Sequence, residues 1–326
     1  MSKKAMIGFG GGILAIVAAV VIYLVGFSGG PGGPTGGGDA ASGKAKAEKL
    51  FSALNSSGDF KARGGQVTWG SAENLGDQGV LIKNLSIKGK NKKGEAGEVT
   101  AEELRVKRLD WNKINGSPYA DIEIKGLTSK QFAESPQFKG FMATTGMKNL
   151  ILDMKIRYEY KADGQLMDVQ EVVVTARELG TFTLRAQIHG LDISALQGMQ
   201  KAGKVDPAQM MGMAAAIRIG KIYLSFKDNG AIDKSATMQA KKTGADKDKV
   251  MSGMIAQLEQ QKAAIPVEIG KKAADAVIKF LKNKSTLIAK ADPANPVAVL
   301  QLVMGGRSIA NIDKIAKQLN VSITAD

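Results

Sequence analysis

The stretch that decides the fold is LILDMKIRYEY, residues 150–160, in which apolar and polar side chains alternate. Successive side chains of a β-strand point to opposite faces of a sheet, so alternation with a period of two predicts a strand. The even-numbered residues form an apolar face, and the other face holds Ile151, Asp153, Lys155, Arg157 and Glu159. Such a strand is typical of an antiparallel sheet with one face in water.

Neighbouring stretches extend this strand into a larger sheet. Residues 161–164, KADG, contain an Asp-Gly turn, and the runs at 166–176 and 181–188 predict two further strands that complete a meander. Hairpins are also predicted at 80–106, around GKNKKG, and at 217–240, around KDNG. Additional strands are predicted at 67–69, 119–124, 285–293 and 321–324.

Helical periodicity occurs mainly in the later part of the chain. Helices are predicted at 44–54, partly at 129–145, and at 192–203, 207–216, 246–264, 267–282, 296–305 and 309–319. Because strands come first and most helices come late, the pattern favours an α+β fold over a parallel α/β sheet. The expected core architecture is an extended antiparallel sheet built from hairpins.

The run from Met6 to Phe27 has no charged residue and is long enough to cross a hydrocarbon core of about 30 Å as a helix. Lys3 and Lys4 precede it, and the next basic residue is Lys44, so the positive-inside rule places the N-terminus in the cytoplasm. A cleaved signal peptide also begins in this way. However, the run exceeds an h-region of about 7–15 residues and lacks an A-x-A cleavage site.

The Gly/Pro/Ser stretch SGGPGGPTGGGDAASG follows the apolar run and predicts a flexible tether. We therefore expect a cytoplasmic tip and transmembrane anchor at 1–27, a linker at 28–43 and a periplasmic α+β domain at 44–326. The expected location is the bacterial inner membrane, crossed once.

Composition restricts the possible chemistry and partners. The chain has no Cys, which excludes disulfides, thiolate catalysis and Cys-based metal sites. Its net charge of +14 suits anionic partners such as phospholipid headgroups. Nucleic acid is not an expected partner, because the domain is expected to be exported and only 5% of the residues are aromatic.

No catalytic residue, metal site or cofactor is expected. His189 is the only histidine and follows a predicted strand, where a surface or turn role is the expected one. Asp228 and Asp233 flank a predicted turn, where Asp side chains hydrogen-bond to the backbone. P-loop, dinucleotide-binding and nucleophile-elbow motifs do not occur. The sequence therefore predicts a protein that is not an enzyme.

Two clusters have both a functional and a structural interpretation. Met-rich surfaces adapt to varied apolar ligands, although core filling is the alternative, and the cluster comprises Met199, Met210, Met211 and Met213. The basic hairpin tip could touch anionic headgroups, although a solvated turn is the alternative, and it comprises Lys88, Lys90, Lys92 and Lys93.

Several stretches resemble a known group of proteins. They are the anchor, KADG, GLDISAL at 190–196, KDNGAIDKSATMQAKKTG at 227–244, FLKNKSTLIAKADPANPVAVLQL at 280–302 and QLNVSIT at 318–324. The anchor, KADG and GLDISAL resemble inner-membrane-anchored bacterial envelope proteins of the AsmA-like type and a loosely related uncharacterised periplasmic group. The last three stretches are similar to the uncharacterised group, and the resemblance covers mainly residues 150–326. The resemblance implies a curved sheet with an apolar inner face and, as in AsmA-like proteins, phospholipid handling between membranes. This chain is much shorter than the long bridge-forming members.

We therefore expect a membrane-anchored periplasmic protein that binds or shelters lipid acyl chains on the apolar sheet face. The residues expected to line this face are Leu150, Leu152, Met154, Ile156, Tyr158, Phe182, Leu184 and Ile188. The alternative is a non-enzymatic scaffold or assembly factor of an envelope complex, with a protein partner. The two hypotheses differ in whether this face is an open groove or is covered.

Overall fold

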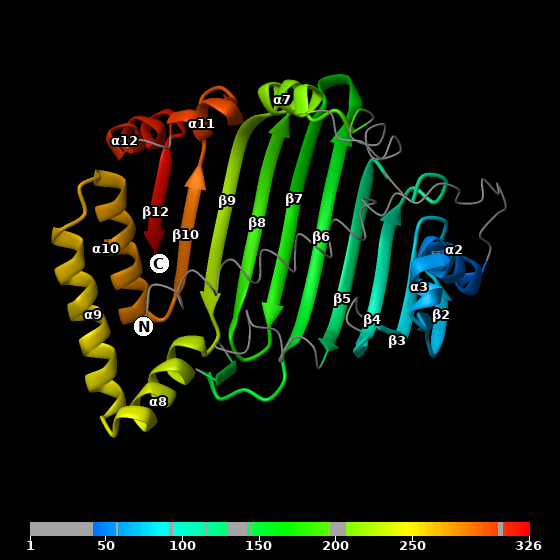
Figure 1. Ribbon diagram of the computed structural model, residues 1–326, viewed down its shortest axis with the longest axis horizontal. Coiled ribbons are helices and arrows are strands. Elements are labelled where there is room, and N and C mark those ends of the chain that lie inside the picture. The colour runs from blue at the N-terminus through cyan, green and yellow to red at the C-terminus, as the bar shows by residue number, and fades with distance from the viewer. Residues whose placement is uncertain are drawn as a thin grey trace.

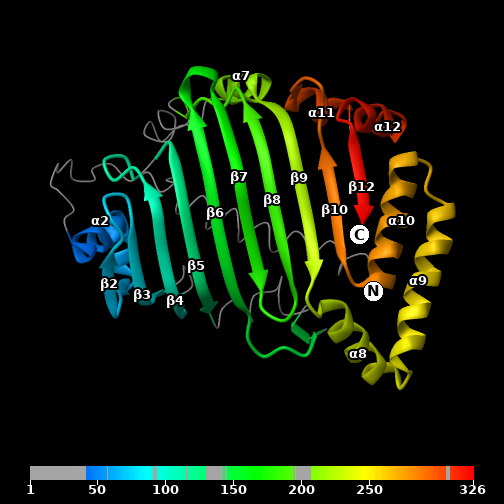
Figure 2. The same ribbon diagram turned by 180° about the vertical axis from the view of Figure 1, so that it is seen from behind.

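A computed structural model describes residues 42–56, 58–90, 94–114, 117–129, 142–143, 145–193, 195, 207–305 and 309–326. One large sheet dominates the structure, with helices near its two side edges and at both ends of its strands (Figures 1 and 2). The described strands form a single sheet of 12 strands in which each pairing is antiparallel. The prediction of an α+β fold around an antiparallel sheet is therefore confirmed.

The strands are β1 Gln66–Thr68, β2 Ser71–Asn74, β3 Val80–Lys90, β4 Ala96–Leu109, β5 Tyr119–Ser129, β6 Ile151–Lys161, β7 Leu166–Ala176, β8 Gly180–His189, β9 Arg218–Asp228, β10 Thr286–Ala291, β11 Val297–Ala298 and β12 Val321–Ala325. Their order is β1-β3-β4-β5-β6-β7-β8-β9-β10-β12, and β2 pairs with β3 while β11 pairs with β9. From β3 to β10, strands that follow one another in the chain are neighbours in the sheet. Local hairpin signals predicted the pairing of β3 with β4 and the meander of β6, β7 and β8.

The helices are α2 Gly43–Ser56, α3 Gly58–Ala62, α7 Pro207–Ala216, α8 Ala231–Thr243, α9 Lys247–Ala263, α10 Glu268–Asn283, α11 Val299–Gly305 and α12 Ile309–Gln318. At one side edge, α2 packs on β2 and β3, and at the other side edge α10 packs on β12. Figure 1 shows α7, α11 and α12 along one end of the strands.

The decisive stretch forms β6 and shows the expected alternation. Leu152, Met154, Ile156 and Tyr158 are buried, whereas the intervening side chains are only half-buried. A short 3-10 turn at Ala162–Gly164 then leads into β7, which pairs with β6 as predicted.

The hairpin predicted at 217–240 is wrong in its second half, where the structure has helix α8. The Asp228 carboxylate accepts hydrogen bonds from the backbone N–H groups of Gly230 (3.2 Å) and Ile232 (3.1 Å), and so caps this helix. Gly230 has a φ of 123°, a conformation that favours glycine. The segment after it is rich in Ala, Lys, Met and Gln, which are good helix formers. Helix propensity and capping thus determine this segment.

Other differences involve short elements. The sequence did not predict β2 or α3, and the helix predicted at 296–305 begins with β11, which pairs with Ile219 and Arg218 of β9. Elements of two to five residues are too short to show a periodicity. Most of the helices predicted at 129–145 and 192–203 lies outside the described residues, as does the run from Met6 to Phe27. Within the described part of the chain, no helix is both long and apolar enough to cross a membrane.

Candidate functional site

Strand register arranges the apolar side chains in rows that cross the sheet. One row consists of Ile82, Leu104, Ile124, Met154, Val174, Phe182, Phe226, Leu287 and Ala325. The next row consists of Val80, Val106, Ile122, Ile156, Val172, Leu184, Leu224, Ala289 and Ile323. Opposed residues of paired strands lie on the same face. The apolar face is therefore continuous from β3 to β12.

Burial changes along this face. In β6, Leu152, Met154 and Ile156 are only 2–3% exposed. In β8, the predicted site residues Phe182, Leu184 and Ile188 are half-buried, and so are Leu224 in β9 and Leu287 in β10. The predicted residues of β6 and β8 thus share one face but differ in exposure. Leu150 precedes β6 and belongs to the buried cluster together with Tyr158.

Helices pack on this face at both side edges of the sheet. Near the first edge, Phe51 of α2 stacks on Trp69 with ring centroids 5.8 Å apart. Near the other edge, the ring of Phe280 in α10 meets Phe226 edge-on at 5.9 Å. Strands β8 and β9, with Leu184 and Leu224, lie between these two edges.

The opposite face of the sheet is charged. Arg157 donates to Asp121 at 3.0 Å, and the other cross-strand ion pairs include Lys155 with Glu171 at 2.6 Å, Lys107 with Glu123 at 2.5 Å and Lys125 with Glu103 at 3.4 Å. Cross-strand pairs of opposite charge stabilise a sheet modestly and keep this face hydrated. The two faces therefore offer different chemistry.

Arg177 links two strands of this charged face, because it bonds to Glu102 of β4 and to Asp153 of β6. Its guanidinium donates to both carboxylate oxygens of Asp153, at 2.9 and 3.1 Å, and to both of Glu102, at 3.0 and 3.2 Å. Asp153 also accepts the backbone N–H of Gly126 at 2.8 Å. Partial burial by itself raises the pKa of Asp153, but the hydrogen bonds from Arg177 and Gly126 outweigh it and hold that pKa below its usual value.

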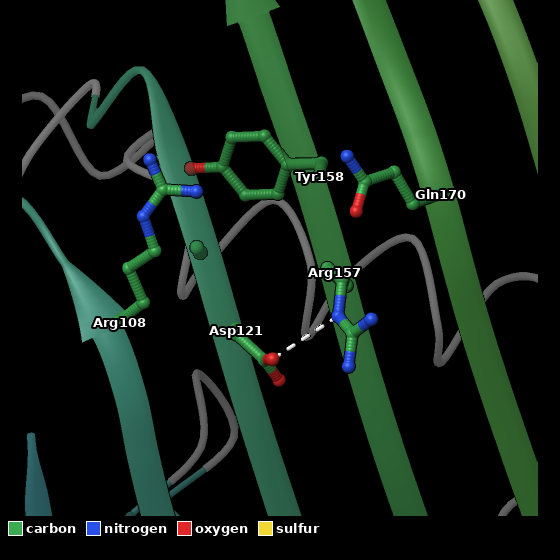
Figure 3. A pocket seen from close by; sticks show the side chains of 6 residues that line it. Arg108, Asp121, Arg157, Tyr158 and Gln170 are labelled. Carbon is green, nitrogen blue, oxygen red and sulfur yellow. Dashed lines mark hydrogen bonds and ion pairs between the residues drawn. The ribbon is translucent and has the colours of Figure 1, made fainter.

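A pocket of about 390 Å³ opens where register shifts occur in β4 and between β6 and β7. Figure 3 shows Asp121 between Arg108 and Arg157, with Gln170 on the neighbouring strand. A β-bulge bends a strand and redirects its side chains, which accounts for a hollow in a sheet face. Because Arg157 already pairs with Asp121, this carboxylate is a structural ion-pair partner.

Gln170 also borders a second pocket, of about 410 Å³, that extends over β8, β9 and β10. The ring of Tyr223 lies there with the guanidinium carbon of Arg185 at 5.5 Å and the ammonium of Lys290 at 5.7 Å from its centroid. At the rim, Lys221 pairs with Asp292 at 3.2 Å. Both pockets are thus hollows lined by ion pairs and cation–π contacts.

The histidine and the two aspartates named in the sequence analysis lie at the ends of strands or in the first turn of a helix. His189 ends β8 opposite Arg218. Asp228 caps α8, and Asp233 pairs with Lys284 at 2.7 Å and Lys247 at 2.8 Å; these hydrogen bonds lower its pKa. Among the described residues, no group of three or more His, Asp or Glu side chains is placed to hold a metal ion.

The basic hairpin tip and the Met cluster lie at opposite ends of the strands. Lys88 and Lys90 are exposed near the end of β3, and Lys88 pairs with Glu98 at 3.6 Å. Lys92 and Lys93 lie outside the described residues, as does Met199. Met210, Met211 and Met213 are in α7.

Comparison with known proteins gives a likeness without a function. A family model described only as an uncharacterized protein matches residues 173–326. The chain is similar to that family from within β7 to its last residue, a segment that includes the half-buried part of the apolar face. No curated protein matches the chain.

Proposed function

We propose that this protein is a membrane-anchored periplasmic protein that shelters lipid acyl chains on the β8–β10 part of its apolar face. One observation carries the proposal: the face is continuous across the sheet, yet its side chains are buried in β6 and half-buried in β8, β9 and β10. Apolar surface left in water costs about 25 cal/mol per Å². An acyl chain laid over Leu184 and Leu224 would remove this cost.

The lining favours lipid over a polar ligand. Along the two rows, β8, β9 and β10 contribute only Phe, Leu and Ala side chains, and Arg185, Lys227 and Lys290 alternate with them on the other face. Such a surface has no hydrogen-bonding side chain to fix a polar molecule in place. With the predicted anchor, it suits the phospholipids of the inner membrane as partners.

Binding to such a face can be reversible. Burying a methylene group from water is worth about 0.8 kcal/mol, but an acyl chain in a bilayer is already out of water. Lipid tails and Leu side chains are similarly apolar. Transfer between bilayer and sheet therefore exchanges one apolar environment for another, as lipid handling requires.

The test is Leu184→Asp in the full chain, purified in mild detergent. A carboxylate among acyl chains is strongly unfavourable, whereas in the lipid-free protein it reaches water. We expect the variant to fold, while the phospholipid that co-purifies per protein falls well below wild type. Thr183→Asp is the matched control, because Thr183 is the neighbouring residue on the opposite face. Lipid that surrounds the predicted anchor should be the same in wild type and both variants, so it does not affect the comparison. Equal lipid content in both variants would refute the proposal.

A second candidate is a scaffold or assembly factor of an envelope complex, and the burial of β6 favours it. Leu152, Met154 and Ile156 are as buried as core side chains, so this part of the face has the character of a closed core. On this hypothesis, Leu184→Asp leaves lipid content unchanged and disrupts a protein complex. Native gel electrophoresis after cross-linking in cells would measure that loss.

A further inference from the structure

We infer that the sheet stands with one end of its strands on the inner-membrane surface, and that this end is formed by the turn Leu75–Gly79, α7 and α11. This inference rests on the proposed function, because it takes the membrane anchor as given. It adds the orientation of the domain and the place where lipid enters.

Strands β3 and β9 run in the same direction, so these three segments lie at the same end of the strands, although the register places Val80 level with Leu224, six residues inside Arg218. The turn leads directly into Val80, which begins β3, and α7 leads to Arg218, which begins β9. Helix α11 follows Ala298, the partner of Arg218 in β11. On the strands between β3 and β9, residue pairs near this end are Leu109 with Ala120 (β4 and β5), Tyr158 with Val169 (β6 and β7), and Met167 with Ile188 (β7 and β8). Figures 1 and 2 both show α7 and α11 side by side at this end.

This end carries exposed apolar side chains. The large hydrophobic residues that stand out as exposed in the described structure are Met211 in α7, at 68%, Leu75, at 41%, and Leu300 in α11, at 38%. Trp111 lies beside the turn and donates its indole N–H to the carbonyl of Gln78 at 3.1 Å. Exposed apolar side chains with a nearby Trp are typical of surfaces that contact the membrane interface.

Helix α2, which follows the predicted tether, begins at the same end. Lys46, in the first turns of α2, is buried, and its ammonium donates to Asn74 at 2.7 Å, to the carbonyl of Gly79 at 3.1 Å and to the carbonyl of Gly76. These bonds fix the start of α2 against the turn. If residues 28–43 form the flexible linker that the sequence predicts, their root-mean-square span is roughly 20–24 Å, which would keep this end near the bilayer.

The other end of the strands lies much farther away. β3 has 11 residues, and a strand rises about 3.3 Å per residue, so Lys90 is about 35 Å from the tethered end. The predicted membrane contact of the basic tip would need the domain to turn over on its linker. Apolar docking at α7 and α11 requires no such rotation.

Docking at this end also gives lipid a route. The half-buried apolar residues of β9 begin at Ile219, next to α7, and continue through Ile222 and Leu224 away from this end. An acyl chain that leaves the bilayer at α7 therefore meets apolar side chains along the whole strand.

The absence of Cys from the chain provides a direct test. Single-cysteine variants Met211→Cys, Leu300→Cys and Lys90→Cys, each in the full chain, would carry an environment-sensitive fluorophore. The chain would be reconstituted in phosphatidylethanolamine–phosphatidylglycerol vesicles, with or without a lipid that carries a quencher on its acyl chain. All three positions are exposed, so the labels should not disturb folding.

We expect the labels at Met211 and Leu300 to lose most of their fluorescence to the quencher, and the label at Lys90 to lose little. Stronger quenching at Lys90, or no quenching at any position, would overturn the docking inference. The proposal that lipid binds at Leu184 would still stand, because the co-purification experiment tests it separately. Failure of the chain to insert into vesicles would instead refute the anchor, and with it both proposals.

Discussion

Strands β6 and β8 belong to the same sheet, present alternating side chains and contribute to the same apolar face, yet they differ in burial. Ile156 of β6 is 2% exposed, whereas Leu184, which lies in the same row two strands away, is half-buried. Alternation determines which way a side chain points. Whether that face is then covered depends on what packs against it, and the two regions differ in that respect.

The comparison also separates the two functional hypotheses. The β6 region has the burial of a core, which suits a scaffold, and the β8–β10 region has the exposure of a surface that an apolar ligand can cover. The likeness to an uncharacterized family spans residues 173–326 and therefore covers the second region. Substitutions matched between the two regions can break or sharpen this contrast.

The largest expected effect is that of Ile156→Asp. A carboxylate buried among Met154, Ile122 and Val172 has no water to reach, which costs several kcal/mol. This is a large fraction of a typical stability of about 5–15 kcal/mol, so we expect the domain to unfold or to melt far earlier. Leu224→Asp, in the half-buried region, should cost much less because the carboxylate can be hydrated. Urea unfolding of both variants measures the contrast, and equal losses would contradict it.

The sequence was sufficient to predict the sheet, the meander from β6 to β8 and the apolar residues of its faces, because these depend on period-two alternation and local turns. It was not sufficient for α8, where the Asp228 cap and helix propensity replace the expected second strand. Alternation also gave no sign that Leu184 is more exposed than Ile156. The pocket at Arg108 and Gln170 depends on bulges, which shift register without a sequence signal of their own.

A smaller effect is expected from Arg177→Met, which tests how the charged face supports the buried region. Removing the guanidinium leaves Asp153 and Glu102 without their shared partner. Hydrogen bonds to charged groups are worth about 1.5–3 kcal/mol, and exposure to solvent reduces this, so we expect a loss of about 1 kcal/mol at pH 7. Arg185→Met, in the open region, should cost less because the Arg185–Glu171 contact is longer, at 4.0 Å.

The same variant should have a characteristic pH dependence. The pKa of Asp153 is lower in the folded chain than its usual value of about 3.9. Such a group stabilises the fold above its unfolded pKa, and this contribution disappears as the pH falls through the folded pKa. The stability difference between wild type and Arg177→Met should therefore be full above about pH 5 and shrink at lower pH. Urea titrations between neutral and acid pH measure it, and a constant difference would exclude the Asp153 contact as its cause.

The last comparison is between two tyrosines of β6. Tyr158 is buried and donates its hydroxyl to the carbonyl of Ser117 at 3.0 Å, while Tyr160 is half-buried and donates to the carbonyl of Leu191 at 2.9 Å. Burial raises the pKa of Tyr158, so its hydroxyl remains a donor at all moderate pH values. Tyr158→Phe leaves a buried carbonyl without this bond, at a cost of about 1–2 kcal/mol, whereas water can replace the hydroxyl in Tyr160→Phe. We expect a lower melting temperature for the first variant than for the second, although both lose one oxygen atom and one hydrogen bond of similar length. Equal melting temperatures would mean that water reaches the carbonyl of Ser117, and the boundary between the closed and open regions would then lie within β6 itself.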